Sequence, residues 1–158
     1  MAATNPLLDA YPLPDFAAFK PELVEPAIDA RLVQGRIAVG EVAAREAEGR
    51  PLDWDTVVAP LEAAADALDR TWSPVRHLHS VADSPALREA YNACLAKLSE
   101  YRTELGQNEG LFRAYRALSS SSEFVSLEPA QRRVVEDALR EFRLSGIDLD
   151  ETDRARFK

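Results

Sequence analysis

The side chains in this sequence that are best suited to chemistry are two histidines, one cysteine and a few acidic pairs. His77 and His79 are the only histidines, and Cys94 is the only cysteine. Imidazole and thiolate groups serve as nucleophiles, proton carriers and metal ligands. Whether these groups act together depends on the helix faces that they occupy.

The two histidines stand two positions apart, which on a helix directs them to different faces. A pair that chelates one metal ion stands four positions apart, as in His-Glu-x-x-His. The sequence holds neither that motif nor the Glu-x-x-His of di-iron bundles. We therefore expect His77 and His79 to be structural or solvated.

Cys94 falls on the apolar stripe of a predicted helix and has no histidine beside it in the sequence, so we expect a buried and inert thiol. A glycine-rich phosphate loop and a Gly-x-Ser-x-Gly motif are also absent from the sequence. We assign no catalytic residue, no cofactor-binding residue and no metal ligand to this chain.

Several acidic and aromatic residues look like site components but have simpler explanations. Close carboxylates on a helix cap it or face solvent, and tryptophans at helical spacing anchor a core. These residues are Asp53 with Asp55, Asp66 with Asp69, and Trp54 and Trp72. The arginines at 132, 133, 140 and 143 alternate with acidic residues at helical spacing, which is typical of a solvated ion-pair face.

The charge distribution argues against a nucleic-acid partner. The net charge is −8, and the whole excess lies in residues 1–69, which carry 13 acidic and 5 basic side chains. A nucleic-acid binder needs a basic surface. The sequence has no basic residue before Lys20 and no apolar run near the ~20 residues of a membrane span. We therefore expect a cytoplasmic protein with no membrane partner, and the single cysteine fits a reducing compartment.

The apolar pattern predicts an all-α fold, an antiparallel helical bundle. Pro6, Pro12 and Pro14 predict that an extended N-terminal arm precedes it, because proline fixes φ and removes a hydrogen-bond donor. We expect the arm at residues 1–20, a helical domain at 21–149, and the start of a further helix at 150–158. The predicted helices run from Pro21 or Pro26 to Glu48, from Asp53 to Val81, from Pro85 to Leu118 with an interruption at Gly106–Gly110, and from Pro129 to Gly146. Ser119–Ser122 reads as a polar linker.

Details within these helices follow from proline and apolar spacing. Pro60 is expected to bend the second helix, and Ser73-Pro74 to break or kink it. Its stripe is predicted to include Ala65. The third helix is expected to be the central packing element. Its stripe consists of Leu87, Tyr91, Cys94, Leu98, Tyr101 and Leu105.

Six segments of the sequence, taken in order, resemble the N-terminal region of the thimet oligopeptidase family of zinc metallopeptidases. They are Asn5-Pro6-Leu7-Leu8 and residues 73–81, 84–91, 98–101, 106–111 and 139–147. The resemblance implies a longer, mostly helical protein whose two lobes flank a deep channel. It also implies a zinc-binding His-Glu-x-x-His helix in the C-terminal half and cleavage of short peptides. None of these catalytic residues has a counterpart here. Glu128 departs from the better helix cap often found before the proline.

The leading hypothesis is a non-catalytic N-terminal domain whose partners are the remainder of the parent peptidase and, through it, short peptides. An acidic helix start at Asp150 so near Lys158 leads us to expect that the chain is a piece of a longer protein. We then expect self-association through a bared surface. Its candidate residues are Phe16, Phe19, Ile147, Leu149 and Phe157.

Two alternatives remain open at this point. One is a stand-alone interaction module that presents an apolar groove to a partner helix. The other is a small enzyme that uses His77 or Cys94. The downstream coding sequence separates the module from the domain, and zinc content with a peptide-cleavage assay separates the enzyme from it.

The isolated chain is expected to bind no zinc stoichiometrically and to cleave no peptide. Catalytic zinc needs three protein ligands and an open fourth position, which two histidines on different faces and one core cysteine do not supply. Metal analysis after dialysis and a peptide-cleavage assay measure both properties. One-to-one zinc that survives dialysis and is lost in His77→Ala would contradict this expectation.

Overall fold

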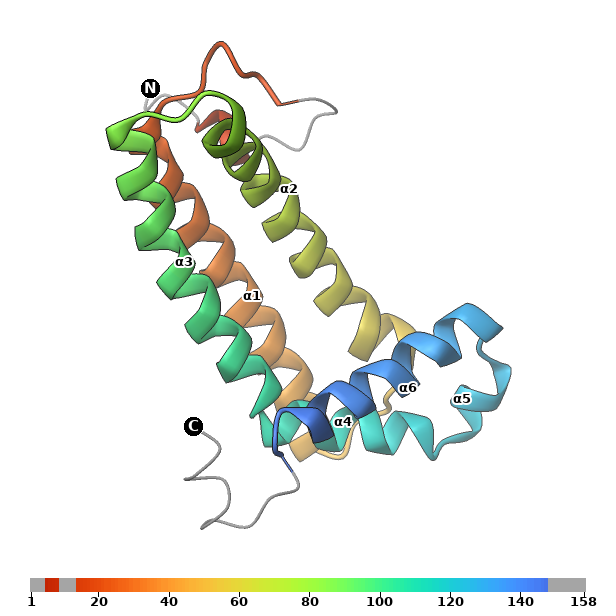
Figure 1. The fold of residues 1–158 in the computed structure, drawn as a ribbon. Helices are drawn as coiled ribbons and strands as arrows, with labels where there is room; N and C mark the ends of the chain where they lie inside the picture. The colour runs from red at the N-terminus through yellow and green to blue at the C-terminus, as the bar shows by residue number, and fades with distance from the viewer. Residues whose placement is uncertain (1–4, 9–13, 148–158) are drawn as a thin grey trace. The chain divides into compact units, whose positions relative to one another are not determined.

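The computed structural model describes residues 5–8 and 14–147, and every regular element in this part of the chain is helical (Figure 1). The sequence-based prediction of an all-α fold is confirmed. The helix expected to start at Asp150 lies outside the described residues. The elements are the short helices η1 (Pro6–Leu8), η2 (Pro21–Leu23) and η3 (Trp54–Val58), and the α-helices α1 (Val24–Ala47), α2 (Ala59–Val81), α3 (Pro85–Gly106), α4 (Glu109–Ser119), α5 (Ser122–Ser126) and α6 (Pro129–Leu144).

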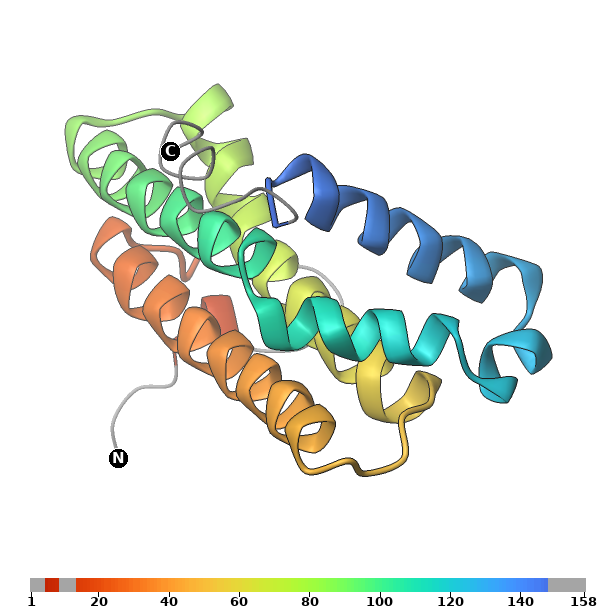
Figure 2. The same cartoon turned by 90° about the horizontal axis from the view of Figure 1, so that it is seen from below.

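The chain forms two compact units, each built from two stretches of sequence. Unit 1 contains the described residues up to Arg36 together with Ala63–Glu100, and unit 2 contains Ile37–Glu62 together with the described residues from Tyr101. The long helices α1, α2 and α3 therefore contribute to both units. In unit 1 the helices α1, α2 and α3 alternate in direction, and in unit 2 α6 runs back alongside α4, whereas α4 does not turn back on α3 (Figures 1 and 2).

Unit 1 has a core in which α1, α2 and α3 bury their apolar stripes. Its buried apolar residues include Val24, Ala27, Ile28, Leu32, Trp72, Val75, Leu87, Ala90, Cys94 and Leu98. Ser84 caps α3 as predicted, because its Oγ accepts a hydrogen bond from the backbone N–H of Leu87 at 3.2 Å. Every predicted stripe residue of α3 is buried or half-buried.

Unit 2 has its own core, to which α1, η3, α4 and α6 contribute. The buried cluster consists of Val42, Val57, Val58, Leu111, Phe112, Ala114, Tyr115, Leu118, Val135, Leu139, Phe142 and Ile147. The Phe142 ring of α6 lies 5.8 Å from Phe112 and 5.7 Å from Tyr115 of α4, measured between centroids. Asn108 starts α4 by accepting the N–H of Leu111 at 2.9 Å. Burial of Ile147 corrects its placement on a bared surface, since it belongs to this core.

The N-terminal arm is not fully extended, because Pro6–Leu8 forms a 3₁₀ turn. Asn5 caps this turn: its Oδ1 accepts the N–H of Leu7 at 3.0 Å, and its carbonyl accepts the N–H of Leu8 at 2.9 Å. Proline suits the first position of such a turn, where its missing N–H leaves no bond unmade. The turn at Pro6–Leu8 therefore corrects the prediction that the arm is extended at these residues.

The second predicted helix, from Asp53 to Val81, consists of a π-helical turn, η3, followed directly by α2. Asp53 and Thr56 cap the turn reciprocally, with Asp53 Oδ1 accepting the N–H of Thr56 at 2.9 Å. Of the break or kink expected at Ser73-Pro74, the break does not occur, because Pro74 lies inside α2, which continues to Val81. Pro74 is itself buried, and this packing compensates for the backbone bond that proline removes. Ala65 is exposed, and Ala64 is half-buried instead.

One short helix was missed, and the predicted ends of α1 and α6, at Glu48 and Gly146, lie within two residues of the observed ends at Ala47 and Leu144. The helix α5 follows Ser121, whose Oγ accepts the N–H of Phe124 at 3.4 Å. Phe124 packs against the core of unit 2, and this contact holds α5 in place. The serine-rich sequence predicted only a polar linker at Ser119–Ser122. Gly49 and Gly146 have φ of 64° and 80°, the left-handed conformation with which glycine ends helices.

Two helical glycines allow a matched test of packing in unit 2. A Cβ at Gly110 of α4 would lie 2.7 Å from the Cβ of Ala43, whereas a Cβ at Gly40 of α1 would meet nothing within 4 Å. We expect Gly110→Ala to lower the free energy of unfolding by about 1–3 kcal/mol through overpacking. Gly40→Ala is expected to raise it by about 0.5–1 kcal/mol, because alanine loses less backbone entropy. Urea unfolding measures both, and shifts of equal sign would show that α1 and α4 do not approach this closely.

Candidate functional site

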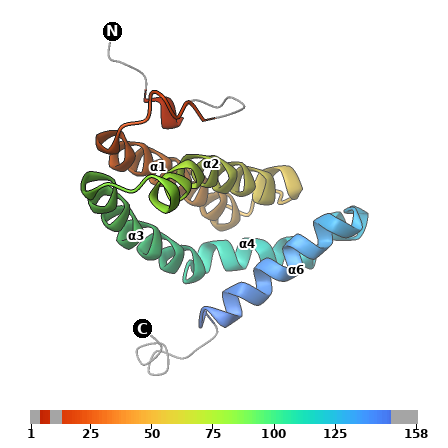
Figure 3. The same ribbon diagram turned by 45° about the horizontal axis from the view of Figure 1, so that its top comes forward.

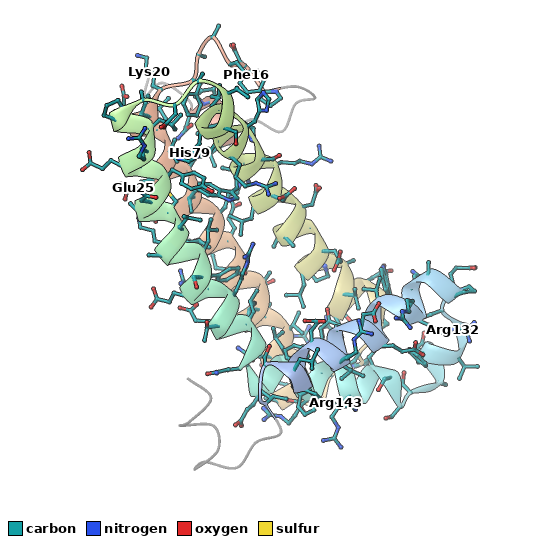
Figure 4. All side chains as sticks on the ribbon, in the orientation of Figure 1. Phe16, Lys20, Glu25, His79, Arg132 and Arg143 are labelled. Carbon is teal, nitrogen blue, oxygen red and sulfur yellow. The ribbon has the colours of Figure 1, made fainter. Side chains whose placement is uncertain are left out.

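His79 is one end of a column of three aromatic rings. Its ring stacks on Tyr91 with centroids 4.0 Å apart, and Tyr91 stacks on Trp72 at 4.8 Å. The column joins α2 to α3 in unit 1, and His79 is labelled in Figure 4. His79 Nε2 also lies 4.0 Å from Asp83 Oδ1. These contacts give His79 a packing role, in agreement with the sequence-based expectation.

Asp83 lies in the turn between α2 and α3, and Arg88 holds it there. Arg88 Nε donates to Asp83 Oδ2 at 2.9 Å. The hydrogen bond from Arg88 is the largest cause of a lowered pKa at Asp83, with smaller contributions from the charges of Arg88 and His79. The carboxylate is thus ionised and paired, and it serves the turn rather than acting as a proton donor.

His77 has different surroundings from His79. Its side chain is exposed, and its ring lies 5.8 Å from that of Phe16 at an angle of 52°. His77 thus contacts Phe16, which precedes α1 in the chain, whereas His79 contacts Tyr91 of α3. The structure does not bring the two imidazoles to one site, as their spacing on a helix predicted.

Cys94 is completely buried in unit 1. Burial raises the pKa of its thiol to about 11, the negative charge of Glu25 adds to this, and Lys97 opposes it. A thiol with this pKa is protonated near neutral pH, and the thiolate is the form that reacts. The predicted inert core cysteine is therefore what the surroundings of Cys94 produce.

An ion cluster near Cys94 was not predicted from the sequence. Lys97 Nζ of α3 lies 3.1 Å from Glu25 Oε2 and 2.7 Å from Asp29 Oδ1 of α1. The hydrogen bond to Asp29 raises the pKa of Lys97, and the bond to Glu25 adds to the effect. Two acidic residues four positions apart on a helix repel each other, which hinted that a cation lies between them. Only the fold shows which cation it is.

A second polar contact in unit 1 also escaped the sequence reasoning. Arg31 of α1 donates from Nε to Thr71 Oγ1 of α2 at 3.0 Å. Thr71 is fully buried, although it is polar and lies beside the apolar stripe of α2. Buried hydroxyls need partners. Its position next to Trp72 was the one available signal.

Unit 2 uses its ionisable groups for capping and surface ion pairs. The hydroxyl of Thr56 is the largest cause of a lowered pKa at Asp53, the cap of η3. On α6, Asp137 pairs with Arg133 at 2.9 Å and with Arg140 at 3.2 Å, as the predicted ion-pair face requires. Arg132 and Arg143 lie near the two ends of this helix (Figure 4).

One buried phenol in unit 2 has a strongly shifted pKa. Burial raises the pKa of Tyr115 to about 12, and the charge of Glu62 adds to this shift. Its ring packs against Phe142 in the core. Tyr115 is therefore a core residue that keeps its proton at neutral pH.

Among the described residues, no three or more His, Cys, Asp or Glu side chains are grouped so that they could hold a metal ion. None of the described helices is long and apolar enough to cross a membrane. The residues whose side chains could take part in chemistry are distributed over helix caps, ion pairs and ring stacks. Their contacts hold helices together.

Comparison with known proteins gives consistent matches along the chain. The family model described as the N-terminal domain of neurolysin/thimet oligopeptidase matches residues 38–154. Oligopeptidase A of Salmonella typhimurium is 47% identical over 98% of this chain, and that of Escherichia coli is 45% identical over 98%. A protein of Arabidopsis thaliana named "Probable cytosolic oligopeptidase A" is 33% identical over 98%. The chain spans 22% of the length of each of these relatives.

The pKa of Cys94 leads to a testable expectation. The native thiol should resist modification by a disulfide reagent at pH 8 and become reactive in urea, because burial holds its pKa near 11. The folded pKa is raised, so this group's contribution to stability is present below the unfolded pKa and is lost as pH rises through about 11. Absorbance of the released thiol follows the reaction. Equal rates with and without urea would contradict the burial of Cys94.

Proposed function

This chain belongs to the neurolysin/thimet oligopeptidase family, and on that premise we propose that it serves as the non-catalytic N-terminal domain of an oligopeptidase A-like zinc metallopeptidase. The observation that carries this proposal is the match along nearly the whole chain to relatives several times its length. The remainder of the parent is its partner, and residues 21–149 form its helical body.

The proposed role of the domain is to form part of the wall of a substrate channel. Such a wall acts by exclusion, since a narrow cleft admits flexible short peptides and keeps out folded proteins. It requires a rigid surface and no reacting group. The commitment of His79, Cys94 and Asp83 to packing and pairing contacts supports a role of this kind.

Other parts of the proposal extend from the relatives. The parent would carry the catalytic zinc elsewhere and degrade short peptides. It would be cytoplasmic, as the name of the Arabidopsis thaliana relative suggests for that protein. Self-association of the isolated chain also stays a prediction. It rests on exposed apolar residues such as Phe16, which is 47% exposed, while Ile147 no longer supports it.

The channel-wall role is tested in the full-length parent. A version that lacks residues 1–147 and the intact parent are compared on a series of peptides of increasing length, with zinc content as the check that the catalytic part is folded. If the domain limits substrate size, its removal should raise the rate on long peptides relative to short ones. A stand-alone module would leave the ratio unchanged, and a uniform loss of activity with zinc retained would also contradict the exclusion role.

A further inference from the structure

The N-terminal segment Asn5–Leu8 is held against α1 and α2 by its own main chain. Arg31 Nη2 donates to the carbonyl oxygen of Leu8 at 2.9 Å, and Thr71 Oγ1 donates to that of Leu7 at 3.0 Å. Figure 3 shows this segment lying over α1 and α2 within unit 1. Because Arg31 also donates to Thr71, the two side chains form one polar site that spans two helices.

Two side chains of the segment complete the attachment. Leu7 is the buried residue of the turn, so it supplies apolar contact. Asn5 Nδ2 donates to the carbonyl oxygen of Leu23 at 2.8 Å, just before α1 begins. The segment is thus held by two carbonyl contacts, one leucine and one asparagine.

Both side chains of the polar site have other hydrogen-bond partners besides the segment. Thr71 has one hydroxyl hydrogen and two acceptors at 3.0 Å, the carbonyl of Leu7 and that of Ala67 one turn earlier in α2. A bond of this second kind is common for threonine inside a helix. Arg31 likewise keeps Gln34 Oε1, which lies 2.9 Å from its Nη1. Departure of the segment therefore leaves neither side chain without a partner, and the penalty for an unpaired buried group is avoided.

We propose that Arg31 and Thr71 form a docking site for a short peptide segment, which residues Asn5–Leu8 occupy as a detachable strap. Carbonyl oxygens are common to all residues, so the polar site fixes the position of the main chain, and Leu7 and Asn5 supply the sequence preference. The ligand class is a peptide turn with the sequence Asn-Pro-Leu-Leu. This inference rests on contacts inside unit 1 and is independent of the proposed peptidase role.

Hydrogen exchange tests whether the strap opens separately. The N–H of Leu8 bonds to Asn5 inside the turn, so its exchange reports on the strap, while that of Val75 reports on the core of unit 1. In the wild-type chain, Leu8 should exchange faster than Val75. Thr71→Val should speed exchange at Leu8 by roughly tenfold, the effect of about one hydrogen bond, and leave Val75 unchanged. Thr71→Ser is the matched control and should behave as wild type.

The same experiment has a clear contrary outcome. If Leu8 and Val75 exchange at one common rate in all three proteins, the segment opens only when unit 1 unfolds, and it is not a strap. If Thr71→Val and Thr71→Ser affect Leu8 equally, the hydroxyl does not hold it.

A peptide added in trans tests the site itself. Leu7→Asp should displace the strap, because a carboxylate would otherwise be buried without a partner. The acetylated and amidated peptide Asn-Pro-Leu-Leu should then shift the NMR signals of Arg31 and Thr71. It should bind the wild-type chain at least about tenfold more weakly, since the tethered segment competes at an effective concentration in the millimolar range.

Equal binding to both proteins would overturn the proposal, and so would no binding to a folded Leu7→Asp chain at millimolar peptide. Circular dichroism establishes that this variant is folded. If it is not, hydrogen exchange in the Thr71 variants decides the matter, since valine replaces the threonine hydroxyl with a methyl group and serine keeps the hydroxyl.

Discussion

The structure depends on one constraint: each of the three long helices has to bury an apolar stripe in two different units along its length. In α3 the residues Leu87 to Leu98 belong to unit 1, whereas Tyr101 and Leu105 belong to unit 2. A regular stripe at three- and four-residue spacing keeps one face apolar over the whole helix. Neither unit could be assembled from a contiguous piece of the chain, because each needs helices that the other also uses.

This arrangement explains where the polar side chains are found. Helices that meet in a core hold their relative position through a few specific contacts at its edge. These contacts use the ionisable and aromatic side chains that could otherwise take part in chemistry. Lys97 joins α3 to two carboxylates of α1, and the column from Trp72 to His79 joins α2 to α3. The imidazole of His79 is stacked on Tyr91, and the carboxylate of Asp83 is held by Arg88, so both groups already serve structural contacts. The same contacts thus give the scaffold its geometry.

A scaffold of this kind fits the role proposed above, in which the domain would act through its surface as part of a larger peptidase. Family membership supplies that context, and the described residues supply the physical basis, since the ionised and aromatic groups serve packing. The N-terminal segment adds a different type of contact. Main-chain carbonyls recognised by Arg31 and Thr71 tie the start of the chain to α1 and α2 through bonds that have alternative partners when they open.

Local signals in the sequence determined the helical class, most helix limits, and the burial or helix face of several candidate site residues. Ser84, Asn108 and Asp53 act within one turn of chain, so their capping contacts follow from local sequence. Periodicity likewise predicted that Cys94 is buried and that His77 and His79 diverge. Tertiary structure alone decided that Lys97 meets Glu25 and Asp29, that Thr71 is buried against the N-terminal segment, and that Pro74 stays inside α2. The physical reason is that these outcomes depend on packing between residues tens of positions apart, whose pairing no local pattern encodes.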